Sequence, residues 1–250
     1  MRAVTELKQP GTAKNTGESG IVTSKQVAVH PRLAICVGRH LQVPWAQPLH
    51  RPTLDSYRQL EQQSVFSASQ PLILDSGCGT GSSTQRLAAM FPAHLVIGVD
   101  RSLKRLSKSG VTSGLFHSEN YILLRAELAT FWRLLLDSGI SPERHLLFYP
   151  NPWPKPRHLS RRWHGHPVFP QFLALGGEIE MRSNWDIYAR EFAQAASLAT
   201  AANIGMKEIH PDEGGSPFEK KYLERGQRLF SVRVPAHDTG AFRRSWLERH

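Results

Sequence analysis

The stretch LILDSGCGTG at residues 72–81 decides the fold. A short apolar run ends in an acid, Asp75, which is followed by three glycines at alternate positions and then by a segment of helical composition at 82–91. A strand, a tight glycine turn and a helix in this order open a βαβ unit, and glycines in the turn permit positive φ angles and let a ligand lie against bare backbone. The dinucleotide fingerprint would place its third glycine where this chain has Ser82. The pattern predicts a ligand-binding loop of another class.

Strands and helices alternate downstream of this loop. Apolar runs predict seven strands, at 72–75, 94–99, 121–124, 145–149, 178–182, 204–210 and 229–234. Segments of helical composition lie at 54–63, 82–91, 102–109, 127–137 and 185–201. This alternation predicts an α/β fold with a doubly wound, mostly parallel seven-stranded sheet that is covered by helices on both faces.

The length of 250 residues suits a single domain with unstructured ends. Residues 1–30 are rich in Gly, Thr, Ser and Lys and show no apolar period, so we expect a disordered basic arm there. Within the domain at 31–250, we expect residues 31–69 to form a lid or an extra layer on a core at 70–235. Residues 236–250 are assigned to a C-terminal tail.

The composition favours a nucleic-acid partner. There are 31 Lys and Arg residues against 21 Asp and Glu residues, a net charge of +10 that attracts phosphate-rich polymers, although basic residues also simply keep a protein soluble. No apolar run approaches the ~18 residues of a membrane span, and the N-terminus has no secretory signal, so we expect a cytoplasmic protein without a membrane partner. The two cysteines, Cys36 and Cys78, are too few for a disulfide framework. We expect no metal site, because the histidines at 158–166 have no accompanying cysteine.

Three acids follow three successive predicted strands. Asp75 ends the first strand, Asp100 ends the second, and Glu127 follows the third. A carboxylate at the position of Asp100 can accept both hydroxyls of a ribose, whereas Asp100 alone would be interpreted as a turn or N-cap residue and Glu127 alone as a first-turn helix charge. Taken together, the three acids predict a cofactor cleft at the carboxyl ends of the strands.

Two motifs extend this interpretation to a known family. The loop at 75–81 resembles the D/E-x-G-x-G-x-G loop of class I S-adenosylmethionine-dependent methyltransferases. The stretch YPNPWPKPRH at 149–158 resembles the P-D-P-W-x-K-x-R-H signature of tRNA (guanine-N7)-methyltransferases, and SNWDIYA at 183–189 and SPFE at 216–219 resemble its T-D-x-x-x-Y-A and T-x-F/Y-E motifs. The resemblance covers about residues 70–230 and implies a Rossmann-like fold, transfer of a methyl group to guanine N7 and a role in tRNA processing.

The resemblance also implies roles for individual residues. S-adenosyl-L-methionine would be the cofactor, bound by Asp75, Gly77, Gly79, Gly81, Asp100, Ala126 and Glu127. Asn151 occupies the position of the catalytic aspartate. The substrate, tRNA or another structured RNA, would be bound by Lys155, Arg157, His158, Asn184, Ser216 and Glu219.

Asn151 and Asn184 are departures, because the family has Asp at both positions. Guanine N7 is an exposed lone pair, so transfer to it needs alignment more than a base. A carboxylate, however, can accept from guanine N1–H and N2–H together, whereas an amide offers one acceptor and two donors. Two alternatives therefore stay open: a divergent paralogue that methylates another nucleobase or an amine, and a non-catalytic RNA-binding protein that retains the fold.

The segment at 155–166 is basic and contains aromatic residues. We expect its cations to pair with RNA phosphates while Trp153 and Trp163 stack on unpaired bases, although a charge run alone is more often a solvated surface. The phosphate contacts are assigned to Lys155, Arg157, Arg161 and Arg162. The sequence leaves the oligomeric state open.

Overall fold

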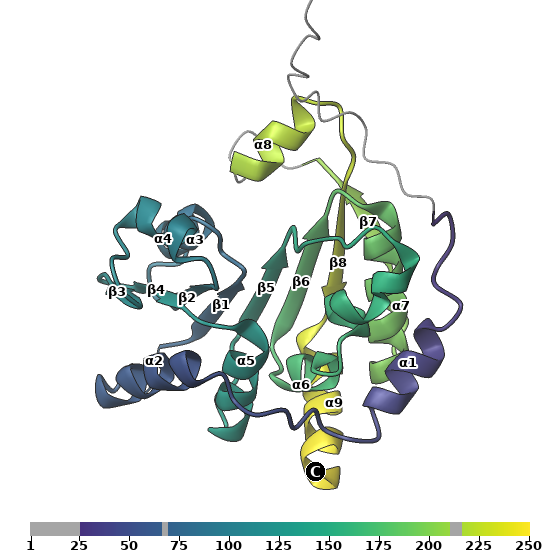
Figure 1. The fold of residues 1–250 in the computed structure, drawn as a ribbon, viewed down its shortest axis with the longest axis horizontal. Coiled ribbons are helices and arrows are strands. Elements are labelled where there is room, and N and C mark those ends of the chain that lie inside the picture. Colours follow the sequence, from purple (N-terminus) through teal and green to yellow (C-terminus); the bar gives the residue numbers. More distant parts are fainter. Residues whose placement is uncertain (1–25, 67–69, 211–216) are drawn as a thin grey trace, which may run out of the picture.

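The computed structural model describes residues 26–66, 70–210 and 217–250, which form one twisted sheet with helices on both faces (Figure 1). Within these residues the strand order is β3-β4-β2-β1-β5-β6-β8-β7. The strands are β1 (Leu72–Ser76), β2 (Leu95–Asp100), β3 (Leu115–His117), β4 (Tyr121–Arg125), β5 (Arg144–Phe148), β6 (Glu178–Ser183), β7 (Met206–Ile209) and β8 (Leu229–Val234). The predicted fold class is confirmed, but the predicted number of strands is wrong. The described part of the chain has eight strands, because the short β3 adds to the edge of the sheet, antiparallel to β4.

Parallel pairing brings five strand ends to one edge of the sheet. β1 lies between β2 and β5 and is parallel to both, β4 continues the parallel sheet beyond β2, and β6 continues it beyond β5. Antiparallel pairs join β6 to β8 and β8 to β7. Every residue of β1 and β2 is buried, as expected for strands with helices on both faces. The loops after β1, β2, β4, β5 and β6 therefore leave the sheet at the same edge.

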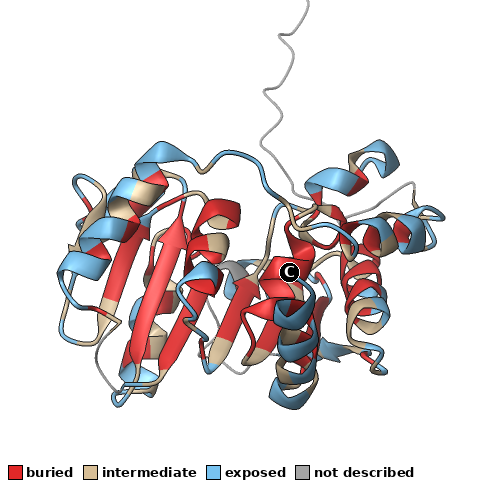
Figure 2. Ribbon diagram, turned by 90° about the horizontal axis from the view of Figure 1, so that it is seen from below, coloured by how far each residue is buried: buried red, intermediate tan, exposed pale blue. Residues whose placement is uncertain are grey.

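The helices are α1 (Leu33–His40), α2 (Arg51–Gln62), α3 (Ser82–Met90), α4 (Leu103–Leu106), α5 (Leu128–Asp137), α6 (Phe169–Ala174), α7 (Asp186–Thr200), α8 (Pro217–Leu223) and α9 (Ala236–Arg249). Short 3-10 turns are η1 (Ser107–Ser109), η2 (Pro156–Arg161) and η3 (Trp163–Gly165). Seen from below, the strands are buried between helices whose outer faces are exposed (Figure 2).

Alternate residues of β1 point to different layers. Leu72 and Leu74 belong to the main core, to which α1, α2, α5, α6, α7 and α9 contribute, whereas Ile73 packs with Ala88 of α3 on the other face. The segment at 31–69 adds α1 against α7 and α2 against α5, so it extends the larger helical layer. Residues 236–249, which the sequence analysis assigned to a tail, form α9, which packs against α6.

Several expectations concern residues outside the described ranges. Residues 1–25 of the expected arm and the substrate residue Ser216 lie there. Among the described residues, no helix is both long and apolar enough to cross a membrane, and no group of His, Cys, Asp and Glu side chains could hold a metal ion. Cys36 and Cys78 are both free thiols.

Candidate active site

The glycine loop lies at the carboxyl end of β1, and its three glycines all have positive φ angles. Gly77 (φ 80°) donates its N–H to the carbonyl of Val99 at 2.7 Å, which ties the loop to β2. A Cβ atom at Gly77 would meet nothing within 4 Å, so the backbone there faces open space. Gly81 (φ 83°) is the N-cap of α3, and a Cβ atom there would come within 2.7 Å of the Leu123 side chain. The loop therefore has bare backbone available to a ligand.

Asp75 connects β1 to the start of α3. Its Oδ2 accepts hydrogen bonds from Ser83 Oγ at 2.6 Å and Thr84 Oγ1 at 2.8 Å, and its side chain is buried. Burial raises the pKa of the carboxyl group, while the two hydroxyl donors oppose this effect. In this arrangement Asp75 fixes the glycine loop against the first turn of the helix.

Asp100 links the glycine loop to the N-terminus of α4. Its Oδ2 accepts from the Gly79 N–H at 3.0 Å, and its Oδ1 accepts from the Ser102 N–H at 2.7 Å. Arg105 Nη2 also lies 3.0 Å from Oδ1, and the Arg105 side chain is about half exposed while the carboxylate is almost fully buried. A ribose that approaches Oδ1 would therefore compete with a guanidinium that can move into solvent.

Glu127 caps α5. Its two carboxylate oxygens accept from the N–H groups of Ala129 at 3.1 Å and Thr130 at 2.7 Å, as an N-cap side chain does. Its own N–H donates to Thr53 Oγ1 of α2 at 2.8 Å, so the N-terminal segment helps to hold Glu127 in place. The adjacent Ala126 is buried and donates its N–H to the carbonyl of Asp100 at 3.2 Å. The third acid thus follows β4, next to the end of β2.

The loop after β5 holds Asn151 in a strained turn. Tyr149 and Trp153 have φ angles of 51° and 45°, a region that residues other than glycine rarely adopt. Asn151 Oδ1 accepts from the Trp153 N–H at 3.2 Å, which is the Asx turn that Asn favours. The Asn151 side chain is exposed, and among the described residues we find no hydrogen-bond partner for its Nδ2. Asn151 therefore presents two N–H donors to solvent at the carboxyl end of β5.

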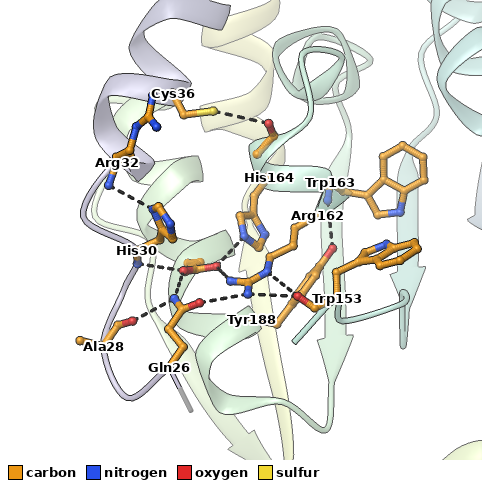
Figure 3. A network of polar contacts seen from close by, with 12 residues as sticks. Gln26, Ala28, His30, Arg32, Cys36, Trp153, Arg162, Trp163, His164 and Tyr188 are labelled. Carbon is orange, nitrogen blue, oxygen red and sulfur yellow. Dashed lines mark hydrogen bonds and ion pairs between the residues drawn. The ribbon is translucent and has the colours of Figure 1, made fainter. Parts of the chain in front are cut away.

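A buried polar network holds this turn from behind (Figure 3). Arg162 donates from Nε and Nη2 to the carbonyl of Trp153 at 3.2 and 3.1 Å, and its Nη1 forms an ion pair with Glu191 of α7. His164 Nε2 lies 3.0 Å from the same carboxylate. The prediction that Arg162 binds a phosphate is wrong, because only 1% of its side chain is exposed and its donors are directed at protein groups. A run of basic residues in the sequence does not reveal a counter-ion 29 positions away.

The N-terminal segment joins this network. Glu191 Oε1 accepts from the His30 N–H at 2.9 Å and from Gln26 Nε2, and Gln26 Oε1 accepts from Arg162 Nη2 at 3.0 Å. Burial by itself would raise the pKa of Glu191, but the hydrogen bond from His164 and the charges of His164 and Arg162 outweigh it and lower the pKa to about 2. Residues 26–30 of the expected arm are thus tied to an ionised carboxylate behind the substrate loop.

The other cations of the loop face solvent. Lys155, Arg157 and Arg161 are exposed, and the Arg161 guanidinium stacks 4.8 Å from the centre of the Trp153 ring. The pKa of His158 is lowered by desolvation and by the neighbouring positive charges, first among them that of Arg161. The exposed residues therefore form a positively charged surface around the Asn151 turn.

The two remaining substrate residues have protein partners. Asn184 Nδ2 donates to Gln227 Oε1 at 2.8 Å. Glu219 is buried and accepts from Tyr149 Oη at 2.9 Å and from Arg182 Nη1 at 2.7 Å. Glu219 and Arg182 also line a groove of about 1300 Å³ on the α3 side of the sheet. No sequence motif pointed to Arg182, because its role depends on a partner 37 residues away.

Comparison with known proteins identifies the family of this chain. The family model described as "Putative methyltransferase" matches residues 69–236. A tRNA (guanine-N(7)-)-methyltransferase of Pseudomonas syringae pv. syringae is 33% identical over 177 residues, which cover 66% of this chain and 69% of the relative. The chain belongs to the tRNA (guanine-N7)-methyltransferase family. A second tRNA (guanine-N(7)-)-methyltransferase, from Stutzerimonas stutzeri, is 31% identical over 176 residues. These residues cover 66% of this chain and 71% of that relative.

Membership of the tRNA (guanine-N7)-methyltransferase family confirms the resemblance inferred from the sequence. The chain is an S-adenosylmethionine-dependent methyltransferase, and the open backbone at Gly77, in a loop that Gly79 ties to Asp100, fits this cofactor. A crystal structure of the 16S rRNA methyltransferase KamB has a TM-score of 0.50 at 15% identity, covering 69% of this chain and 91% of that chain. At this identity the likeness concerns the fold alone, and it agrees with the class I methyltransferase sheet.

Proposed function

We propose that this chain transfers the methyl group of S-adenosylmethionine to N7 of a guanine in tRNA. The observation that carries the proposal is that the Asn151 turn and the glycine loop follow β5 and β1, which are neighbouring parallel strands. The curated relatives, which are named as tRNA (guanine-N(7)-)-methyltransferases, support the choice of substrate.

The chemistry requires alignment of two bound molecules. S-adenosylmethionine supplies an electrophilic methyl group on its sulfonium. The lone pair of guanine N7 forms the new bond to this carbon as the bond from carbon to sulfur breaks, and its electron pair remains on sulfur. N7 carries no proton, so the chain needs no general base and contributes mainly by holding the reactants in line. Asn151 can take part in this positioning, because its side chain is exposed and its Oδ1 is fixed by Trp153 while its Nδ2 can still contact a bound base.

The predicted site residues have matching roles in this proposal. The backbone of Gly77, Gly79 and Gly81 would lie along the cofactor, with Asp75 fixing the loop. Asp100 would accept hydrogen bonds from the ribose hydroxyls once the Arg105 side chain has moved away from its Oδ1. Ala126 and Glu127 would lie beside the adenine ring. Binding of the RNA is assigned to Lys155, Arg157, His158, Asn184 and Ser216, whereas the buried Glu219 would act through Tyr149 and Arg182 rather than by touching the RNA.

Asn151 and Asn184 support a second candidate for the target of methyl transfer. An uncharged amide at both positions favours a target whose polar edge differs from that of guanine, such as another nucleobase or an amine. Loss of turnover with retained RNA binding would instead indicate a non-catalytic protein.

One experiment separates these functions. The purified protein is incubated with labelled S-adenosylmethionine and total tRNA, and the RNA is then digested to nucleosides. We expect 7-methylguanosine, and an Asp100→Ala variant serves as the control that should lose cofactor binding and label together. Another methylated nucleoside would point to the divergent paralogue. Cofactor binding without any labelled nucleoside would contradict the proposal and favour the non-catalytic protein.

A further inference from the structure

A hollow of about 220 Å³ lies between α1 and η2, next to the substrate loop. The α1 side contributes Arg32, Cys36 and Arg39, and the η2 side contributes Pro156, Arg157 and Ser160. None of the described residues that line this hollow is an Asp or a Glu. The three arginines are exposed, and no ion pair of theirs is found in the described part of the chain. The hollow is therefore a concave surface with uncompensated positive charge.

The position of α1 beside η2 is set by the core. Leu33 and Val37 are completely or almost completely buried, and α1 packs against α7 and η3. Cys36 Sγ lies 3.5 Å from the carbonyl of Gly165, and the His30 N–H donates to the buried Glu191 just before the helix begins (Figure 3). The same carboxylate anchors Arg162, which holds the substrate turn. Arg32 and Arg39 consequently stand at a defined place relative to Arg157.

The charges of Arg32 and Arg39 also act on neighbouring titratable groups. Burial raises the pKa of the Cys36 thiol, and the charges of Arg39 and Arg32 oppose this rise. Burial lowers the pKa of His40, and Arg39 lowers it further. Guanidinium groups that converge without a carboxylate suit phosphate, because their planar fork can donate two parallel hydrogen bonds to its oxygens.

We propose that α1 belongs to the RNA-binding surface, with Arg32 and Arg39 holding backbone phosphates of the RNA whose target base lies at Asn151. The hollow adjoins η2, which carries Arg157, so one strand of RNA can extend from the target turn to α1. The inference rests on the proposed function only for the identity of the RNA.

The test compares two double variants that remove the same charge. Arg32→Ala/Arg39→Ala alters the proposed surface, and Arg51→Ala/Arg58→Ala alters α2, which packs on α5 at the other side of the molecule (Figure 1). Affinity for total tRNA is measured by filter binding from about 50 to 200 mM salt. Two lost phosphate contacts should reduce the magnitude of the slope of log affinity against log salt by about 1.4 to 1.8. Over this fourfold rise in salt, the affinity of the wild type should therefore fall by a factor about 7 to 12 times larger than that of Arg32→Ala/Arg39→Ala. The α2 variant should keep the wild-type slope.

A charge-retaining variant guards against a change of fold. Arg32→Lys/Arg39→Lys should keep the slope of the wild type, since lysine also neutralises phosphate. The inference is overturned if Arg32→Ala/Arg39→Ala keeps the wild-type slope, or if both alanine variants lose slope equally, because net charge alone would then explain the effect. Nucleoside analysis of the wild type is run in parallel. A flattened slope without 7-methylguanosine would support the role of α1 and overturn the proposed function instead.

Discussion

Replacing Glu191 by Gln tests how strongly the buried ion pair behind the substrate loop stabilises the fold. Glu191 and Arg162 expose 0% and 1% of their side chains, and the carboxylate also lies 3.0 Å from His164 Nε2. Gln has nearly the same shape as Glu but carries no charge. Glu191→Gln would therefore leave the Arg162 guanidinium buried without its counter-ion.

Two independent considerations give the magnitude. Removal of one partner from a buried ion pair costs about 3–5 kcal/mol, because the remaining charge is uncompensated. Although burial acts to raise the pKa of Glu191, its partners lower it from 4.5 to about 2, and at roughly 1.4 kcal/mol per pKa unit the ionised carboxylate contributes about 3.5 kcal/mol. Each kcal/mol shifts the melting temperature of a chain of this size by about 2–4 °C. The substitution should therefore lower the melting temperature by about 6–20 °C.

The pH dependence has a definite sign. Since folding lowers the pKa of Glu191, its contribution is complete above the ordinary value of 4.5 and is lost as the pH falls towards about 2. Urea unfolding at a series of pH values should show the stability difference between the wild type and Glu191→Gln narrowing over this window.

Asp186→Asn on the same helix is the control. Asp186 pairs with Arg190 at 2.6 Å, but the two side chains are 43% and 55% exposed, and such a surface pair contributes only about 0–1 kcal/mol. The buried ion pair would not stabilise the fold as argued if Glu191→Gln melted within about 2 °C of the wild type. The same would follow if Glu191→Gln and Asp186→Asn had equal melting temperatures.

Three further substitutions test the site itself. Arg162→Lys keeps the charge beside Glu191 but lacks the fork that also reaches the Trp153 carbonyl, so kcat should fall while the melting temperature drops less than in Glu191→Gln; unchanged kcat would contradict this positioning role. Asp100→Ala removes charge-assisted hydrogen bonds of about 1–3 kcal/mol and should weaken cofactor binding by about 5- to 150-fold in calorimetry, whereas wild-type affinity would place the ribose elsewhere. Asn151→Asp should raise single-turnover transfer to tRNA by about 10- to 100-fold if a guanine is the target, and a fall would favour a target held by the amide.

The sequence predicted most of the sheet because its central strands are buried on both faces. β1 and β2 are mainly apolar for this reason, and their boundaries lie within one residue of the predicted ones. β3 escaped detection because it has only three residues, none of them buried. α9 was missed since its buried apolar contacts come mainly from Phe242 and Trp246, one turn apart, in a segment that also contains Gly240.

The candidate site was predictable as a set of positions but not as a set of contacts. Glycines and acids after successive strands predict a cofactor site, because the carboxyl ends of parallel strands meet at one edge of a sheet. The groups that engage those acids come from distant segments: Thr53 holds the backbone of Glu127 from a position 74 residues away. The sequence likewise offered no reason to separate the cations at 155–166, because the partner of two of them, Glu191, is distant in the sequence. Arg162 and His164 are buried against Glu191, so RNA can contact only the exposed cations of this segment.

The two asparagines that depart from the family pattern are not equivalent. Asn151 uses its Oδ1 to close the turn at Trp153, a bond that an aspartate would accept equally well, so the turn itself gives no reason for the amide. Asn184 instead donates to Gln227 Oε1, and an aspartate there would need the buried Gln227 amide to rotate and present its N–H groups. The amide of Asn184 thus has a protein partner, whereas that of Asn151 is left to the ligand. An effect of charge at Asn151 on transfer should accordingly reflect the target base rather than the stability of the loop.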